Sequence, residues 1–163
     1  MYKFCRFVVL LSLVAFMNLE SRAELNNSFM MKDLAGKEHH LSDYHGKWVL
    51  VNYWATWCPP CLDEIPDLVS LHENKKSKDL VVLGVAVDYK SELEVRNFVD
   101  DMLISYPVIL GNSKIYSQYG APEILPTTYL YNPQGKLVKV KRGQISKQYI
   151  EQLMKSNDSG LIK

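Results

Sequence analysis

The sequence predicts a mixed α/β fold in which a central sheet is flanked by helices and preceded by a short β-hairpin. Dense apolar runs at 48–54 and 80–87 are typical of buried strands. Each run is followed by a stretch with apolar residues every three or four positions, which is typical of an amphipathic helix. This alternation indicates a parallel strand pair with helices on both faces. A strong turn signal near the C-terminus adds an antiparallel hairpin.

The N-terminal half supplies the first hairpin and two helices. Residues 29–42 hold short mixed segments on either side of Gly36, and this pattern predicts a small hairpin. A helix is expected over 59–71, because it opens with proline, which is tolerated in a first turn. The next helix is expected to begin at Ser91, with Glu94 at the capping-box position three residues on.

The C-terminal half is expected to add antiparallel strands and a last helix. The turn Asn132-Pro133-Gln134-Gly135 carries Pro and Gly at turn-forming positions. No linker interrupts residues 29–155, so residues 24–163 are expected to form one domain. The remaining elements expected here are a strand at 107–110, a helix at 113–119, strands at 127–131 and 136–140, and a helix at 146–155.

Residues 1–23 have the pattern of an export signal. Lys3 and Arg6 give a basic start, a mostly apolar run covers 7–17, and the segment closes with Ser21-Arg22-Ala23. These regions in this order predict a secretory signal peptide. The apolar run is shorter than the roughly 20 residues of a membrane span. The alternative is an uncleaved signal anchor. Either interpretation places the protein outside the cytoplasm, in the periplasm of a bacterium or an equivalent compartment.

The cysteine count of the exported part indicates chemistry rather than structural stapling. Once residues 1–23 are set aside, Cys58 and Cys61 are the only cysteines. A disulfide between them closes almost no loop, so it adds little chain-entropy stabilisation. The 163 residues carry a formal net charge of +1, which gives no electrostatic reason to expect nucleic-acid binding.

The segment Trp57-Cys58-Pro59-Pro60-Cys61 lies where the strand 48–54 gives way to a helix. Residues three apart share a helix face, so the two sulfurs can bond or separate with little backbone movement. Cys58 precedes the first turn, where unpaired amides and the positive end of the helix dipole favour thiolate, the nucleophilic form. Cys61 lies inside the helix and is expected to be the buried, resolving thiol.

A metal site is the alternative use of a CxxC pair. A structural zinc needs four ligands, and the sequence has no second CxxC and no HxxxH. We therefore expect no metal and no cofactor. A copper chaperone that uses both cysteines and one distant histidine stays open as a non-enzymatic alternative. A peroxiredoxin is disfavoured because its Pro-x-x-x-Thr-x-x-Cys pattern is absent. The histidines, interpreted as solvated or hydrogen-bonded surface residues, are His39, His40, His45 and His72.

Residues 49–61, followed by Glu64-Ile65-Pro66, resemble a thioredoxin-fold protein, and specifically the exported TlpA/ResA branch of thiol-disulfide oxidoreductases. The resemblance continues in order along the chain and covers about residues 29–155. It implies the thioredoxin fold with an N-terminal hairpin extension. The further matching segments are 41–47, 82–88, Leu125-Pro126-Thr127-Thr128-Tyr129-Leu130 and Gly135-Lys136.

The resemblance implies that Pro126 is a cis proline facing the disulfide. A proline there has no N–H, and it would leave the Leu125 backbone, just before the strand that starts at Thr127, free to pair with an incoming peptide. This arrangement would also keep metal-ligating groups away from the thiols.

The resemblance also assigns roles around the cysteines. Asn52 stands where thioredoxin has a buried Asp, and an amide does not take up a proton as a carboxylate does. Glu64 matches a Glu of the branch and is a candidate proton acceptor for Cys61. The alternative is a solvated Glu64 paired with a lysine. Trp54 and Trp57 are candidates for shielding the thiols, and Trp54 is equally a candidate for the core.

The sequence therefore predicts an exported thiol-disulfide oxidoreductase that reduces protein disulfides. The resemblance implies apocytochrome c cysteines as substrates and a membrane thiol transporter as electron donor, and the absence of an extra domain favours a monomer. The alternative enzyme is a disulfide oxidant or isomerase. Strongly oxidising members usually carry a helical insertion and another dipeptide between the cysteines, whereas the stretch 88–126 has room for one ordinary helix pair.

Overall fold

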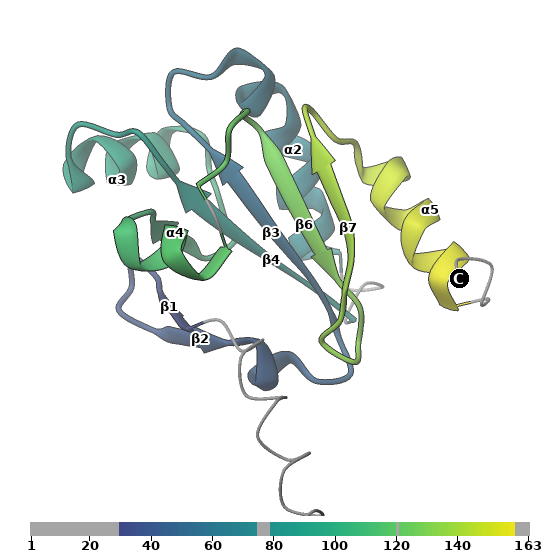
Figure 1. Cartoon of the computed structure of the whole chain (residues 1–163). Coiled ribbons are helices and arrows are strands. Elements are labelled where there is room, and N and C mark those ends of the chain that lie inside the picture. The colour runs from purple at the N-terminus through teal and green to yellow at the C-terminus, as the bar shows by residue number, and fades with distance from the viewer. Residues whose placement is uncertain (1–29, 75–78, 120, 159–163) are drawn as a thin grey trace, which may run out of the picture.

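A five-stranded mixed sheet forms the centre of the computed structural model, which describes residues 30–74, 79–119 and 121–158 (Figure 1). The export signal or anchor expected at 1–23 lies outside the described residues. No helix in the described part is long and apolar enough to cross a membrane. In chain order the elements are β1 (Met30–Lys32), β2 (Glu38–His40), the 3-10 helix η3 (Leu41–Tyr44), β3 (Trp48–Trp54), α2 (Pro59–Glu73), β4 (Leu80–Ala86), α3 (Glu92–Asp101), β5 (Val108–Leu110), α4 (Ser113–Tyr119), β6 (Thr127–Tyr131), β7 (Leu137–Arg142) and α5 (Lys147–Asp158).

The strand order β5-β4-β3-β6-β7 confirms the predicted mixed α/β fold. Strands β3, β4 and β5 are parallel, whereas β6 and β7 are antiparallel to their neighbours. β3 is central, and all seven of its residues are buried, as its apolar run predicted. The expected hairpin before the sheet is also present, because β1 and β2 pair with each other. Most elements fall within a few residues of their expected bounds, and α5 continues to Asp158.

Both faces of the sheet are covered (Figure 1). Helices α2, α3 and α5 pack on one face, and the N-terminal hairpin packs with η3 and α4 on the other. Side chains alternate along β3, so Leu50 and Trp54 face the layer that contains α2, α3 and α5. Val51 and Tyr53 face the layer that contains β1, η3 and α4. Asn52 therefore shares the α2 face with Leu50 and Trp54, and it is the polar residue in an otherwise apolar and aromatic strand.

A glycine in β4 lets two aromatic rings lie directly on this face of the sheet. Gly84 pairs with Asn52 across the β3–β4 ladder. A Cβ atom at Gly84 would lie 2.7 Å from a ring carbon of Tyr106 and 2.9 Å from Trp54 Nε1. Both rings are buried, so a larger residue at this position would have to displace them.

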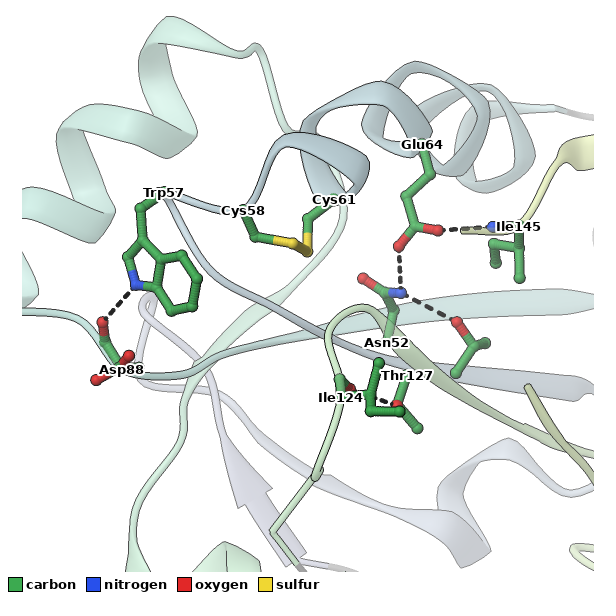
Figure 2. The surroundings of a disulfide bond; sticks show 10 residues. Asn52, Trp57, Cys58, Cys61, Glu64, Asp88, Ile124, Thr127 and Ile145 are labelled. Carbon is green, nitrogen blue, oxygen red and sulfur yellow. Dashed lines mark hydrogen bonds between the residues drawn. A yellow bond between two sulfur atoms is a disulfide. The ribbon is translucent and has the colours of Figure 1, made fainter. Parts of the chain in front are cut away.

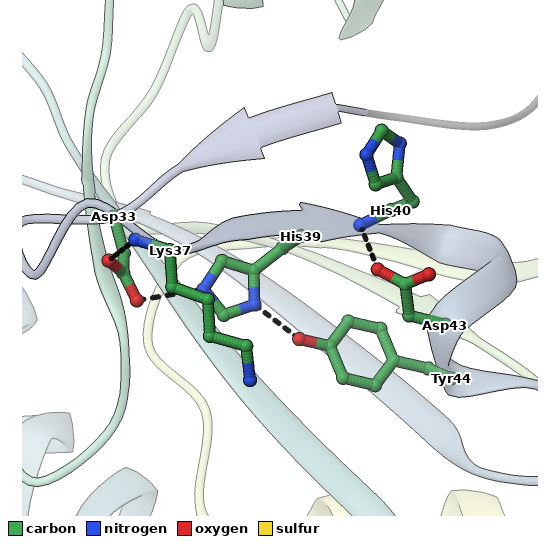
Figure 3. A network of polar contacts seen from close by, with 6 residues as sticks. All are labelled: Asp33, Lys37, His39, His40, Asp43 and Tyr44. Carbon is green, nitrogen blue, oxygen red and sulfur yellow. Dashed lines mark hydrogen bonds and ion pairs between the residues drawn. The ribbon is translucent and has the colours of Figure 1, made fainter.

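The N-terminal hairpin is attached to η3 through a buried histidine, which corrects the surface interpretation of that residue (Figure 3). His39 is 1% exposed, and its Nε2 donates to Asp33 Oδ2 at 2.8 Å. Its Nδ1 accepts from the Tyr44 hydroxyl. Burial alone would raise the pKa of Asp33, but hydrogen bonds from His39 and the Lys37 amide lower it below its usual range. Burial raises the pKa of Tyr44 to about 12, which keeps its hydroxyl a donor.

α3 begins as predicted, after the cap residue Ser91. Ser91 caps the helix, because its Oγ accepts from the Glu94 amide at 3.2 Å. The Glu94 carboxylate also accepts from the Ser91 backbone, which helps to lower the Glu94 pKa. It accepts from the Lys90 amide at 2.9 Å and from Thr56 Oγ1 at 2.6 Å. Glu94 therefore attaches α3 to the loop that leads into the cysteines.

Candidate active site

The two cysteines form a disulfide at the junction of β3 and α2 (Figure 2). Cys58 is the N-cap residue of α2, and Pro59 and Pro60 occupy the first turn. The Cα atoms of Cys58 and Cys61 are 5.3 Å apart. Because the amides of Cys61 and Leu62 both donate to the Cys58 carbonyl, the turn that carries the pair is fixed by the backbone.

The environment of Cys58 favours a negative charge on its sulfur. Its side chain precedes the first turn of a 15-residue helix, where unpaired amides and the helix dipole attract anions. The first turn of α2 contains no acidic residue that would oppose this effect. Cys58 is 3% exposed and Cys61 is fully buried. Cys58 is therefore the less buried of the two cysteines, as expected of the nucleophile.

Glu64 lies one turn beyond Cys61 and is buried beneath the same helix (Figure 2). Its Oε1 accepts from Asn52 Nδ2 at 2.7 Å, and its Oε2 accepts from the Ile145 amide at 2.8 Å. Burial raises the pKa of Glu64 to about 7, against the opposing effect of these hydrogen bonds and of Lys141. The alternative of a solvated Glu64 paired with a lysine is therefore wrong. A carboxyl with this pKa can take up and return a proton near neutral pH.

Asn52 connects Glu64 to the sheet. Its side chain is 1% exposed, and its Nδ2 donates to Thr128 Oγ1 at 3.0 Å as well as to Glu64. Thr128 pairs with Asn52 across the β3–β6 ladder, so the two side chains share one face. Asn52 and Glu64 thus lie together under α2. The resemblance had pointed to each residue separately, without predicting the contact between them.

The loop before β6 contains the expected cis peptide bond, between Leu125 and Pro126. Pro126 and Thr127 are buried. The Thr127 hydroxyl donates to the Ile124 carbonyl at 2.7 Å, and the Gly143 amide donates to the Pro126 carbonyl at 2.8 Å. Among the described residues, the Leu125 amide and carbonyl make no hydrogen bond. The loop is therefore held in place on both sides of an unpaired stretch of backbone.

Cys58 and Leu125 line the same open groove, which has a volume of about 620 Å³. Trp57 stands at its edge with 58% of its surface exposed, and its Nε1 donates to the Asp88 carbonyl at 3.0 Å. Trp54 is a core residue instead, fully buried with its ring 5.2 Å from that of Phe98. The groove is lined by Trp57, Cys58, Pro59, Pro60, Val87, Asp88, Tyr116, Ala121, Pro122, Glu123 and Leu125.

Asp88, Tyr116 and Glu123 also line the groove, and no sequence motif pointed to them. Asp88 lies two residues after the end of the buried strand β4 and has a φ of +51°, and its carbonyl accepts from Trp57 Nε1 in the groove. Its position near a strand end was the only available signal. In the described parts of the chain, no three His, Cys, Asp or Glu side chains lie close enough together to hold a metal ion.

A CxxC pair at the start of the helix after the central strand, with the residue before a cis proline lining the same groove, defines a thioredoxin-fold thiol-disulfide oxidoreductase, and this chain is an enzyme of that class. The AhpC/TSA family profile matches residues 24–140. The chain is 35% identical over 127 residues to the thiol-disulfide oxidoreductase ResA of Bacillus subtilis strain 168, which covers 78% of this chain and 70% of that protein. It therefore belongs to the AhpC/TSA family, among the ResA-type thiol-disulfide oxidoreductases.

Solved structures support the same assignment. A thiol:disulfide interchange protein of the thioredoxin family from Chlorobium tepidum TLS superposes with a TM-score of 0.71 at 29% identity, covering 78% of this chain and 91% of that one. The pneumococcal exposed lipoprotein thioredoxin Etrx1 of Streptococcus pneumoniae strain TIGR4 gives a TM-score of 0.68 at 32% identity, covering 79% and 98%.

Proposed function

We propose that this enzyme acts outside the cytoplasm as a reductant of protein disulfides. The observation that carries the proposal is the open groove, in which Cys58 and the unpaired backbone of Leu125 lie along one surface. An extended substrate segment can pair with that backbone as an added strand. Its disulfide then lies against the Cys58 sulfur.

The reaction starts from the reduced dithiol. The Cys58 thiolate attacks one sulfur of the substrate disulfide, and the second substrate sulfur leaves as a thiolate. The product of this step is a mixed disulfide between Cys58 and the substrate. The helix N-terminus supports the step by holding Cys58 in its thiolate form before the attack.

Release of the substrate requires the buried thiol. The Cys61 thiol gives its proton to the Glu64 carboxylate and attacks the Cys58 sulfur. The Cys58–substrate bond breaks, the substrate leaves as its second thiolate, and the Cys58–Cys61 disulfide forms. Two electrons have then passed from the enzyme to the substrate. The pKa of Glu64, raised to about 7 by its burial, suits it to this proton transfer.

The proposal includes a location and partners. Residues 1–23 direct export, either as a cleaved signal or as an anchor, and residues 24–163 form the catalytic domain, which acts as a monomer. Similarity to an exposed lipoprotein thioredoxin supports a place outside the cytoplasm. Apocytochrome c cysteines are the proposed substrates, and a membrane thiol transporter is the proposed electron donor. Both come from the resemblance to the TlpA/ResA branch.

Trapping of the mixed disulfide tests the proposal. The Cys61→Ser variant retains the nucleophile but lacks the resolving thiol. After reduction and incubation with a disulfide-containing peptide of an apocytochrome c haem site, it should accumulate an adduct that dithiothreitol releases. Cys58→Ser is the matched control and should form none, and both variants also carry Cys5→Ser so that no other thiol can react. If Cys58→Ser forms the adduct and Cys61→Ser does not, the assigned roles are reversed. If the wild-type enzyme oxidises the reduced peptide but leaves the oxidised peptide unchanged, it is an oxidant.

A further inference from the structure

The side-chain oxygen of Asn52 is a buried acceptor without a partner. Its Oδ1 is shielded from solvent and has no hydrogen bond among the described residues. Buried polar atoms in folded proteins are almost always paired, so an unpaired one calls for an explanation. In the proposed reaction Glu64 accepts the proton of Cys61, whereas Asn52 Oδ1 has no role.

The orientation of the Asn52 amide is fixed by its other contacts. Its nitrogen donates to Glu64 Oε1 and to Thr128 Oγ1, which uses both of its hydrogens. When Glu64 is ionised its carboxylate only accepts, so the nitrogen faces Glu64 and the oxygen faces the other way. Figure 2 shows that the oxygen points toward the disulfide sulfurs. Cys61 is fully buried on this side of α2.

In the oxidised enzyme the sulfurs have no hydrogen to offer. Reduction adds two electrons and two protons, breaks the S–S bond and places an S–H on Cys61. That S–H is a donor that needs an acceptor inside a closed site. We propose that Asn52 Oδ1 accepts the hydrogen bond of the Cys61 thiol in the reduced enzyme, which makes Asn52 a positioning residue for the resolving cysteine.

This hydrogen bond would separate the tasks of the two cysteines. It stabilises the thiol form of Cys61 while the helix N-terminus stabilises the thiolate form of Cys58. It also turns the S–H inward, toward the amide that holds Glu64. A neutral amide achieves this without placing a second buried carboxylate beside Glu64. The inference rests on the proposed roles of Cys58 and Cys61.

Other groups near the pair could influence its titration. The titratable groups that interact with Glu64 are Lys141 on β7 and Tyr106 before β5. The competing acceptors for the Cys61 thiol are the backbone carbonyls of the turn that precedes it, such as that of Cys58. A test must therefore observe the thiol itself.

Vibrational spectroscopy of the thiol is such a test. A full-length Cys5→Ser, Cys58→Ser protein retains Cys61 as its only thiol, and its S–H stretching band reports the hydrogen bond. We expect a lower wavenumber in this parent than in the same protein with Asn52→Leu, which keeps the size and removes the acceptor. Thr128→Val is the matched control, because it removes a partner of the amide nitrogen and leaves the oxygen in place. It should keep the band low.

An S–H band at the same wavenumber in the parent and in the Asn52→Leu protein would overturn the proposal, because it would show that the thiol does not donate to Asn52. The Cys61 pKa gives a second readout, measured in a Glu64→Gln background so that the Glu64 charge is constant. Loss of one hydrogen bond to the neutral thiol should lower that pKa by roughly 0.5 to 1 unit. An unchanged or higher value would contradict the proposal.

A measurement on the wild-type enzyme guards against misfolding of the variant. The NMR shift of the Asn52 side-chain carbonyl carbon should move when the disulfide is reduced, and it should not respond to reductant in Cys61→Ala. A carbonyl carbon that does not move in the wild type would refute the hydrogen bond. None of these results depends on the direction of electron flow or on the substrate. The proposed function and the proposed Asn52–Cys61 hydrogen bond can therefore fail independently of each other.

Discussion

Replacement of Glu64 by Gln should remove a large part of the pH dependence of stability of the oxidised enzyme. Burial raises the pKa of this carboxyl from 4.5 to about 7. A difference of 2.5 units at 1.36 kcal/mol per unit corresponds to about 3 kcal/mol. The pKa in the folded state is the higher one, so the neutral carboxyl is favoured by folding. Its contribution is complete below pH 4.5 and is lost as the pH rises to about 7.

The assay is urea unfolding of the wild type and Glu64→Gln between about pH 4 and pH 8, with the disulfide intact. Gln presents one oxygen where the wild type presents two acceptors, to the Asn52 nitrogen and the Ile145 amide. The resulting mismatch costs about 1–3 kcal/mol at every pH. The informative quantity is therefore the change with pH of the difference between the two proteins. The unfolding free energy of the wild type minus that of Glu64→Gln should fall by about 3 kcal/mol as the pH rises.

Asp63→Asn is the control for this prediction, because Asp63 is the exposed neighbour on the same helix. It should leave the pH profile close to that of the wild type. If the difference in unfolding free energy between the wild type and Glu64→Gln changes by less than about 1 kcal/mol between these pH values, the raised pKa of Glu64 is wrong. Such a result would show that Glu64 ionises as an ordinary surface carboxyl does.

Three further substitutions test the surroundings of the site. Gly84→Ala should destabilise the enzyme by about 1–3 kcal/mol in urea unfolding, because the new Cβ would lie 2.7 Å from the Tyr106 ring; a change below about 0.5 kcal/mol would show that the ring moves freely. Thr56→Val should raise the pKa of Glu94, since the hydroxyl hydrogen bond is the main cause of its depression; an unchanged NMR titration would contradict this. His39→Leu should cost about 1–2 kcal/mol in the same unfolding assay, because it removes one hydrogen-bond partner from each of two half-buried side chains, Asp33 and Tyr44. A neutral result would mean that the hairpin contributes little to global stability.

The sequence determined the fold and the redox pair well because both depend on local signals. The buried run of β3 and the proline-opened helix α2 lie next to each other in the chain, so the junction that holds Cys58 and Cys61 follows from their order. The cis bond before Pro126 is different. It was expected only through resemblance to a family, since an isolated Leu-Pro pair favours trans.

The sequence could not determine what surrounds Glu64, because its partners are far apart in the chain. The Ile145 amide that donates to Glu64 is 81 positions from it in the chain. Thr128, the other partner of the Asn52 side chain, is 76 positions from Asn52. Helical spacing placed Glu64 on the Cys61 face but gave no indication of its burial. His39 was misjudged for the same reason, since its burial depends on how the hairpin packs and not on its neighbours in sequence.

The reduction potential of the Cys58–Cys61 pair tests the central claim most directly. It is measured by equilibration of the full-length enzyme in glutathione or dithiothreitol buffers, followed by alkylation of the free thiols. If the enzyme reduces protein disulfides, we expect a reduction potential near that of thioredoxin, about −270 mV, which is typical of a reductant. A reduction potential of about −120 mV would contradict the proposed function. A cysteine pair with so oxidising a potential would take electrons from newly exported proteins instead of supplying them.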